Sequence, residues 1–189
     1  MEGYTPEDRE LLREMRRVRR NVKGKRLLWS LIVWFLIAAA AGWFLIGRYC
    51  AVAIAHGPGM GTAVPAGSVV LAFRPQTGVN PARGDVIVFR RDSALEIMRL
   101  AAVGGDELGR DENGRLTVNG EALGSGAAWT KDAPETPFTV PEGEYFVLGD
   151  RWDLSVDSRS AAFGTVEKDS VVGTVKYLIW PAYRLGEIK

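Results

Sequence analysis

The sequence has almost none of the residues that hold transition metals or cross-link a secreted domain. It contains one cysteine, Cys50, and one histidine, His56, among 189 residues. A single cysteine excludes an internal disulfide and a paired-cysteine metal site. His56 has no acidic or cysteine neighbour at ligand spacing, so we expect it to have a surface or capping role. We expect neither a metal nor another cofactor.

Charge is missing from one long stretch. Residues 27–47 are 21 consecutive positions without a charged side chain. As a helix they would be roughly 30 Å long, which is the thickness of a bilayer's hydrocarbon core. A cleavable signal peptide has an apolar region of roughly 7–15 residues that ends in small residues, whereas here the small residues lie inside the run. The sequence therefore predicts an uncleaved transmembrane anchor that contacts membrane lipid through residues 27–47.

The segment before the anchor, residues 1–26, is basic. It holds nine Lys or Arg and five Asp or Glu, a net charge of +4, so the total of +1 leaves −3 for residues 27–189. The positive-inside rule then predicts a single-pass protein of the plasma membrane with a cytoplasmic N-terminus. Anionic lipid accounts for the basic charge, and we expect no nucleic-acid partner. Four apolar residues recur at helical spacing in this segment: Leu11, Leu12, Met15 and Val18. This spacing fits either an amphipathic helix on the membrane or a solvated charged helix.

The remainder, residues 48–189, predicts one extracytoplasmic domain that is mainly β. Six short runs rich in Val, Ile and aromatic residues, bounded by turn residues, predict strands over 68–73, 85–90, 95–103, 115–120, 144–150 and 170–180. The "DENG" at 111–114 predicts a hairpin turn, because Asn-Gly accepts positive φ. Residues 124–143 are expected to form a loop in which Trp129 and Phe138 serve as anchors. The fold class is therefore mainly β, with short, non-locally paired strands and one N-terminal transmembrane helix.

The stretch "GDRWDLSVDSR" at 149–159 is dense in side chains that hydrogen-bond nearby backbone. It predicts a rigid polar turn in which Asp157 and Arg159 form an internal ion pair. For any one of these residues alone, an ordinary surface turn is the simpler explanation.

The order of the segments resembles that of the bacterial type I signal peptidases, the membrane-bound serine proteases that remove secretory signal peptides. "GPGMGTAVPAG" (57–67) is similar to the family's G-x-S-M-x-P-T-L-x-x-G, and "MRLAAVGGD" (98–106) to its K-R-V-x-G-x-P-G-D. "GDRWDLSVDSRSAAFG" (149–164) is similar to G-D-N-R-x-x-S-x-D-S-R-x-x-G. Further matching segments are "RGDVIVF" (83–89), "GRLTVNGEAL" (114–123) and "VVGTVKYLIWP" (171–181). The resemblance implies the signal-peptidase β-fold, also called LexA–signal peptidase-like.

The resemblance also implies a catalytic pair that this chain lacks. The family uses a serine nucleophile and a lysine whose pKa is lowered by apolar burial so that it acts as a base. In this chain the serine position is Gly59 and the lysine position is Met98. Methionine has nearly the length of lysine and no charge, so it fills an apolar slot without the cost of burying an ammonium. The residues that resemble the family's scaffold are retained: Asp150, Ser155, Asp157, Ser158 and Arg159. Ser158 matches a family serine that supports the lysine.

The family's cleft binds an extended peptide through strand pairing, with shallow pockets for small side chains such as alanine. By this resemblance, the flanks "AVAIAHGPG" (51–59) and "LEIMRLAAV" (95–103) form the two edges of the cleft. The residues expected in it are Gly57, Pro58, Gly59, Met60, Ile97, Met98 and Arg99.

Three functions remain open from the sequence. The first is a pseudo-peptidase without enzymatic activity that binds an extended segment of a secreted or surface protein, such as a pilin or a pre-protein. It would then be similar to signal-peptidase-like proteins of Gram-positive pilus clusters, which assist pilin assembly beside a sortase. The second is an active signal peptidase with a non-standard nucleophile or a partner subunit. The third is a structural membrane-anchored domain with a closed cleft, which an exposed apolar patch beside the cleft would count against.

Overall fold

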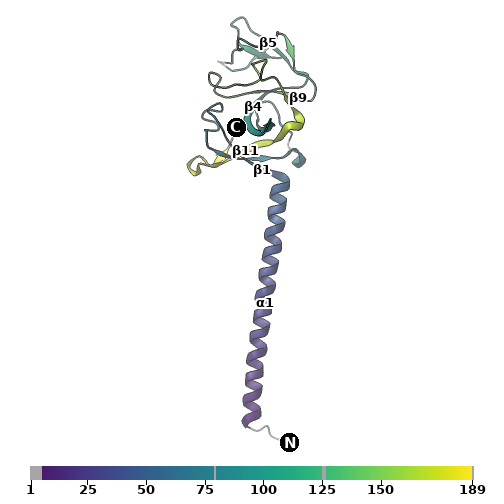
Figure 1. Ribbon diagram of the computed structural model, residues 1–189, viewed down its shortest axis with the longest axis vertical. Coiled ribbons are helices and arrows are strands. Elements are labelled where there is room, and N and C mark those ends of the chain that lie inside the picture. Colours follow the sequence, from purple (N-terminus) through teal and green to yellow (C-terminus); the bar gives the residue numbers. More distant parts are fainter. Residues whose placement is uncertain (1–5, 79, 125–126, 189) are drawn as a thin grey trace. The chain divides into compact units, whose positions relative to one another are not determined.

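The computed structural model describes the backbone of residues 6–78, 80–124 and 127–188, and the chain divides into two compact units at Ile46–Gly47. The described part of the first unit belongs to one continuous helix, α1 (Pro6–Tyr49), whose last residues, 47–49, fall in the second unit (Figure 1). The helix has no break between the basic segment and the anchor. Its stretch Lys25–Tyr49 is long and apolar enough to cross a membrane, as the sequence predicts. The side chains of Leu11, Leu12, Met15 and Val18 lie outside the described residues, so an amphipathic face there stays a prediction.

The second unit is built on an antiparallel sheet in the order β1-β2-β11-β3-β4-β9-β10, with β12 paired to β11 (Figure 1). Its strands are β1 (Cys50–Ile54), β2 (Val69–Phe73), β3 (Val86–Arg91), β4 (Ala94–Val103), β9 (Glu144–Leu148), β10 (Val166–Glu167), β11 (Val171–Trp180) and β12 (Gly186–Glu187). Five of the six predicted strands are present here with ends moved by one or two residues. The mainly-β fold is confirmed.

A smaller antiparallel sheet has the order β7-β6-β5-β8. Its strands are β5 (Glu107–Arg110), β6 (Leu116–Val118), β7 (Glu121–Ala122) and β8 (Phe138–Thr139). Short 3₁₀ turns, η1 (Pro75–Thr77), η2 (Lys168–Ser170) and η3 (Ala182–Arg184), join other elements. The prediction that residues 124–143 are all loop is wrong, because β8 pairs there with β5. A two-residue strand leaves too little periodicity to be recognised.

Two turns of the small sheet show how the sequence sets local structure. Asn119 and Gly120 both have positive φ, 52° and 85°, between the paired residues Val118 and Glu121. This is the geometry of a two-residue hairpin turn, which favours Asn-Gly. In the predicted "DENG" turn Gly114 alone has positive φ (75°), and the Asp111 carboxylate accepts the N–H groups of Asn113 and Arg115.

Three apolar clusters stabilise this unit. The first draws buried residues from β1, β2, β3, β4 and β11 together with the segment that follows β1, so these five strands share one core: Ala53, Ala55, Met60, Val64, Val70, Ala72, Val86, Val88, Ile97 and Val175. The second lies between the two sheets and includes buried Trp129, with Phe138 packed against it. The third includes Ile87, Phe89 and Val147, and Met98 packs against it.

Candidate functional site

A cleft of about 290 Å³ lies beside the first cluster. Three chain segments line it: residues 55–60 after β1, residues 94–98 at the start of β4, and residues 149 and 154–156 of the polar turn. Gly59 and Met98, which are distant in sequence, both lie on its wall. We call this space the cleft.

The β4 wall of the cleft has an unpaired edge. Residues 94–99 of β4 pair with β3, and residues 99–103 pair with β9 on the other side. In the described ranges no strand pairs with residues 94–98 on the β9 side, and these five residues line the cleft. Such an edge is a template for one more strand.

Position 59 has a backbone carbonyl held from two sides and no side chain. The carbonyl oxygen accepts the N–H of Arg151 at 2.7 Å, and the Ser155 hydroxyl donates to it at 3.2 Å. A Cβ added to Gly59 would lie 2.8 Å from Ser155 Oγ. The Ser155 hydroxyl therefore stands where a side chain at position 59 would begin.

Met98 provides apolar packing at the place where the resemblance implies a lysine. It is half-buried and packs against the cluster that contains Ile87, Leu100 and Val147. A thioether neither carries a charge nor takes a proton near neutral pH. Among the described residues no lysine lines the cleft.

The ionisable side chains of the cleft are His56 and Glu96. Burial raises the pKa of the Glu96 carboxyl, the nearby Arg91 charge opposes this shift, and Asp92 adds to it. Sequence analysis assigned His56 to the surface and did not consider Glu96. His56 is exposed, as expected, yet it also lines the cleft.

The polar turn at 149–159 is stabilised by a buried ion pair between Asp157 and Arg159, as predicted. The Asp157 carboxylate accepts the Arg159 Nε–H at 2.8 Å and the Gly149 N–H at 3.1 Å. Arg159 also donates to the carbonyls of Trp152 and Ala128. The ion pair therefore connects the end of the turn to its first residue, Gly149, and to the backbone at Ala128.

Two residues differ in place from what the resemblance implies. Ser158 does not line the cleft; its hydroxyl accepts the Val147 N–H in the interior, whereas Ser155 lies on the cleft wall. Arg99 belongs to another cavity, because Asp150 holds its guanidinium through two bonds of 2.7 and 2.8 Å. The other expected residues, Gly57, Pro58, Gly59, Met60, Ile97 and Met98, all line the cleft.

Sequence reasoning missed the apolar rim of the cleft. Leu154 is 49% exposed and Val156 is 71% exposed, and both line the cleft. Two aliphatic residues inside a polar turn, at alternate positions, were the available signal. An exposed apolar rim opposes the interpretation of a structural domain with a closed cleft.

Comparison with known proteins gives a consistent result. The family described as "Signal peptidase, peptidase S26" matches residues 28–180. Signal peptidase IB of Staphylococcus aureus is 28% identical over 182 residues, which cover 85% of this chain and 92% of that protein. A probable signal peptidase I-2 of Synechocystis is 33% identical over 116 residues, covering 57% of this chain and 52% of its own length.

A signal peptidase I of known structure from Enterococcus faecalis is 30% identical, with 51% of this chain and 97% of that chain covered and a TM-score of 0.40. The family match covers all three segments that line the cleft, including the whole polar turn. This chain belongs to the signal peptidase family of S26 peptidases.

Proposed function

We propose that this protein is a membrane-anchored member of the signal peptidase family that binds an extended segment of a secreted or surface protein without cutting it. The observation that carries the proposal is the composition of the cleft wall. Gly59 and Met98 stand at the two positions where the family has its nucleophile and its base, and both face the same cleft.

Peptide hydrolysis by this family's route needs a hydroxyl activated by a neighbouring base. Gly59 has no hydroxyl, and Met98 cannot accept a proton. Among the described residues that line the cleft, Ser155 carries the hydroxyl, and this hydroxyl donates to the Gly59 carbonyl. This arrangement supports a loss of turnover.

Binding depends on other groups, and these are retained. The unpaired edge of residues 94–98 offers main-chain hydrogen bonds to an added strand, and residues 55–58 form the opposite wall. The exposed Leu154 and Val156 add apolar contact at the rim. A peptide with small side chains fits a cleft of about 290 Å³. A pilin or a pre-protein is the proposed class of partner, with a sortase as a further member of the assembly.

The second candidate function is cleavage by another nucleophile or with a partner subunit. Ser155 supplies a hydroxyl that lines the cleft, and His56 and Glu96 are the ionisable side chains beside it. Because the Ser155 hydroxyl donates to a carbonyl, its proton is not directed at His56. The structure gives this candidate less support than the first.

The experiment compares cleavage and binding in the same preparation. The full chain is placed in liposomes with a pre-protein that has an Ala-x-Ala site, and cleavage is followed on gels while affinity for the uncleaved peptide is measured separately. The variants are Gly59→Ser with Met98→Lys, and Ser155→Ala with His56→Ala. The matched control is Arg110→Gln with Lys131→Gln, two exposed residues outside the cleft.

We expect the natural chain to bind the peptide and leave it intact. The Gly59→Ser, Met98→Lys variant should gain cleavage, which would show that the cleft still positions a peptide. Cleavage by the natural chain that disappears in the Ser155→Ala, His56→Ala variant would contradict the proposal and favour the second candidate. If neither the natural chain nor any variant binds the peptide, both candidate functions are refuted.

The proposed orientation has a convenient test. Cys50, the one cysteine of the sequence, directly follows the candidate span Lys25–Tyr49 and is partly exposed. A membrane-impermeant maleimide added to intact cells should label it if the domain is extracytoplasmic. Labelling only after lysis would reverse the orientation.

A further inference from the structure

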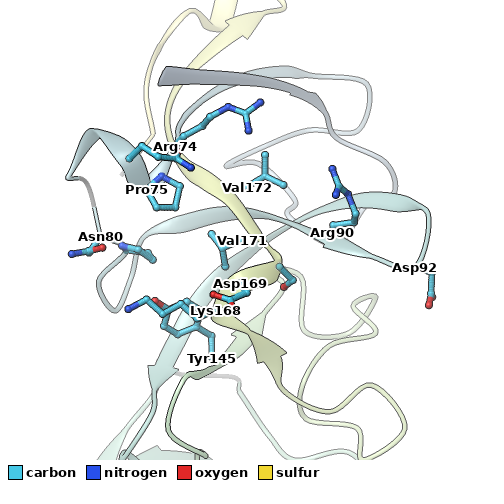
Figure 2. A pocket seen from close by; sticks show the side chains of 13 residues that line it. Arg74, Pro75, Asn80, Arg90, Asp92, Tyr145, Lys168, Asp169, Val171 and Val172 are labelled. Atoms are coloured by element: carbon cyan, nitrogen blue, oxygen red, sulfur yellow. The ribbon is translucent and has the colours of Figure 1, made fainter. Parts of the chain in front are cut away.

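A second cavity, of about 580 Å³, lies away from the cleft on the same unit. It is lined by η1, the segment before β3, the end of β3, Tyr145 of β9, η2 and the start of β11. Figure 2 shows Arg74, Arg90, Lys168, Asp169, Tyr145 and Asn80 arranged around Val171, with Asp92 at the periphery. This volume is within the range of roughly 300–1,000 Å³ that is typical of small-molecule sites.

The polar groups of this cavity are mainly donors. Arg74, Arg90 and Lys168 are cationic, and Asn80 and Tyr145 add an amide N–H and a phenol O–H. Tyr145 is 7% exposed, and burial raises its pKa, so the phenol keeps its proton. Several donors that line one cavity suit a ligand with several anionic oxygens.

Two of the cations are available to a ligand. Among the residues that the structure describes, no carboxylate lies within ion-pairing distance of Arg90 or Lys168. The acidic residues of the lining, Asp92 and Asp169, also lack an ion-pair partner in this part of the chain. Asp169 lies centrally in Figure 2, where its carboxylate can accept the hydroxyl of a polyol.

The cavity is connected to the end of the candidate membrane span. The Arg74 N–H donates to the Tyr49 carbonyl at 2.9 Å, and Arg74 Nε donates to the Cys50 carbonyl at 3.1 Å. Tyr49 is the last residue of the apolar stretch Lys25–Tyr49. Arg74 therefore joins this wall of the cavity to Tyr49 and to Cys50, the residue that directly follows the apolar stretch in the chain.

We propose that this cavity binds a phosphate ester of glycerol, with Arg90 and Lys168 as the cations that attract its phosphate oxygens and Asp169 as the acceptor for a glycerol hydroxyl. A phosphatidylglycerol headgroup and free glycerol phosphate both contain this group. Arg74 and the Tyr145 phenol complete the donor set. The site shares no residue with the cleft, so it does not depend on the proposed function.

The test uses the full chain in a neutral detergent. Calorimetric titrations measure binding of water-soluble dihexanoyl phosphatidylglycerol, dihexanoyl phosphatidylcholine and glycerol phosphate. The site variant is Arg90→Gln with Lys168→Gln. The control is Arg110→Gln with Lys131→Gln, which removes the same charge from exposed positions outside the cavity. Melting temperatures of both variants confirm that they fold.

We expect saturable binding of the phosphatidylglycerol, weakened at least about tenfold in the site variant and unchanged in the control. Competition by glycerol phosphate would support a site for the free ligand as well, and binding of the lipid form alone would support a headgroup site. Equal weakening in the site variant and the control would overturn the proposal. Equal affinity for phosphatidylcholine, or no saturable binding, would do the same.

Discussion

The polar turn at 149–159 forms one side of the cleft and contacts the Gly59 carbonyl on another side, yet the turn and the walls at Gly59 and β4 differ in how they are built. In the turn, side chains are buried and bonded to each other, as in the pair of Asp157 and Arg159. On the cleft wall, the Gly59 and Met98 positions carry no reactive group, and the β4 edge is unpaired. Groups that maintain the fold are therefore separate from groups that would react. The buried pair of the turn therefore does not depend on which side chains occupy positions 59 and 98.

This difference predicts large stability effects in the turn and small ones in the cleft. Asp157→Ala should have the largest effect, because it leaves the buried Arg159 guanidinium without its carboxylate. Breaking a buried pair costs about 3–5 kcal/mol of unfolding free energy. Thermal or denaturant unfolding measures it. Asp153→Ala removes the carboxylate of the exposed Arg151 pair in the same turn and should leave the melting temperature nearly unchanged. Similar losses in both variants would contradict the comparison.

Gly149→Ala tests the packing between turn and cleft. An added Cβ would overlap Ser155 Oγ and lie 2.7 Å from the Gly59 carbonyl oxygen. Overpacking of this kind costs about 1–3 kcal/mol, and we expect the upper end because one of the two atoms is backbone. Unfolding midpoints of Gly149→Ala, alone and with Ser155→Gly, measure it. The second substitution should recover part of the loss; an unchanged midpoint for Gly149→Ala alone would show that the contact relaxes.

Gly59→Ser should lower the free energy of unfolding by less than Gly149→Ala does, even though it introduces a serine at the position where the family has one. Its Cβ would lie 2.8 Å from Ser155 Oγ, so that hydroxyl must rotate away and lose its bond to the Gly59 carbonyl. One such hydrogen bond contributes about 1 kcal/mol. The Arg151 N–H still satisfies the carbonyl. A double-mutant cycle of Gly59→Ser and Ser155→Ala should give a coupling of about 1 kcal/mol. Additive effects would mean that the two side chains do not compete for space.

Glu96→Gln should have the smallest effect, and one that depends on pH. Burial raises the pKa of Glu96, so the folded state binds its proton more tightly than the unfolded chain does. The stability from this group is complete below the ordinary pKa of about 4.3 and is lost as pH rises through the raised value. The variant should therefore melt slightly higher than the natural chain at neutral pH and equally near pH 3. The opposite order at neutral pH would contradict the burial effect.

The sequence predicted the parts of this structure that have long or specific patterns. The uncharged run, five strands of the larger sheet and the Asp157–Arg159 pair were all readable, because an unbroken apolar run, a Val- and Ile-rich run or a dense set of polar residues marks them. The short β6 was also predicted, because turn residues lie on both sides of it. The strands β5, β7, β8, β10 and β12 were missed, since two to four residues carry little periodicity. β1 was named as a cleft edge but not as a strand, and its sequence "CAVAI" has small residues that fit several conformations.

The cleft was predictable only where motifs mark it. Six of the seven expected residues line it, but Arg99 does not, because its guanidinium turns to Asp150 across the sheet. The roles of Ser155 and Ser158 could not be separated by sequence, since both lie in one turn and only the packed structure decides which hydroxyl faces inward. The cavity lined by Arg90 and Lys168 brings together residues between 74 and 172 of the sequence, and no local pattern reveals such a meeting.

The unpaired edge of β4 has a consequence for the protein in the absence of any partner. Main-chain groups on a strand edge accept any extended chain, including the same edge of another copy, and this is the usual route to edge-to-edge aggregation. Glu96 lies within this edge, so two copies that pair around it would bring two carboxyl groups together. In their ionised form these groups repel each other, and we expect this repulsion to oppose edge-to-edge association of the unoccupied protein. Acidification protonates the carboxyl groups and should weaken the repulsion.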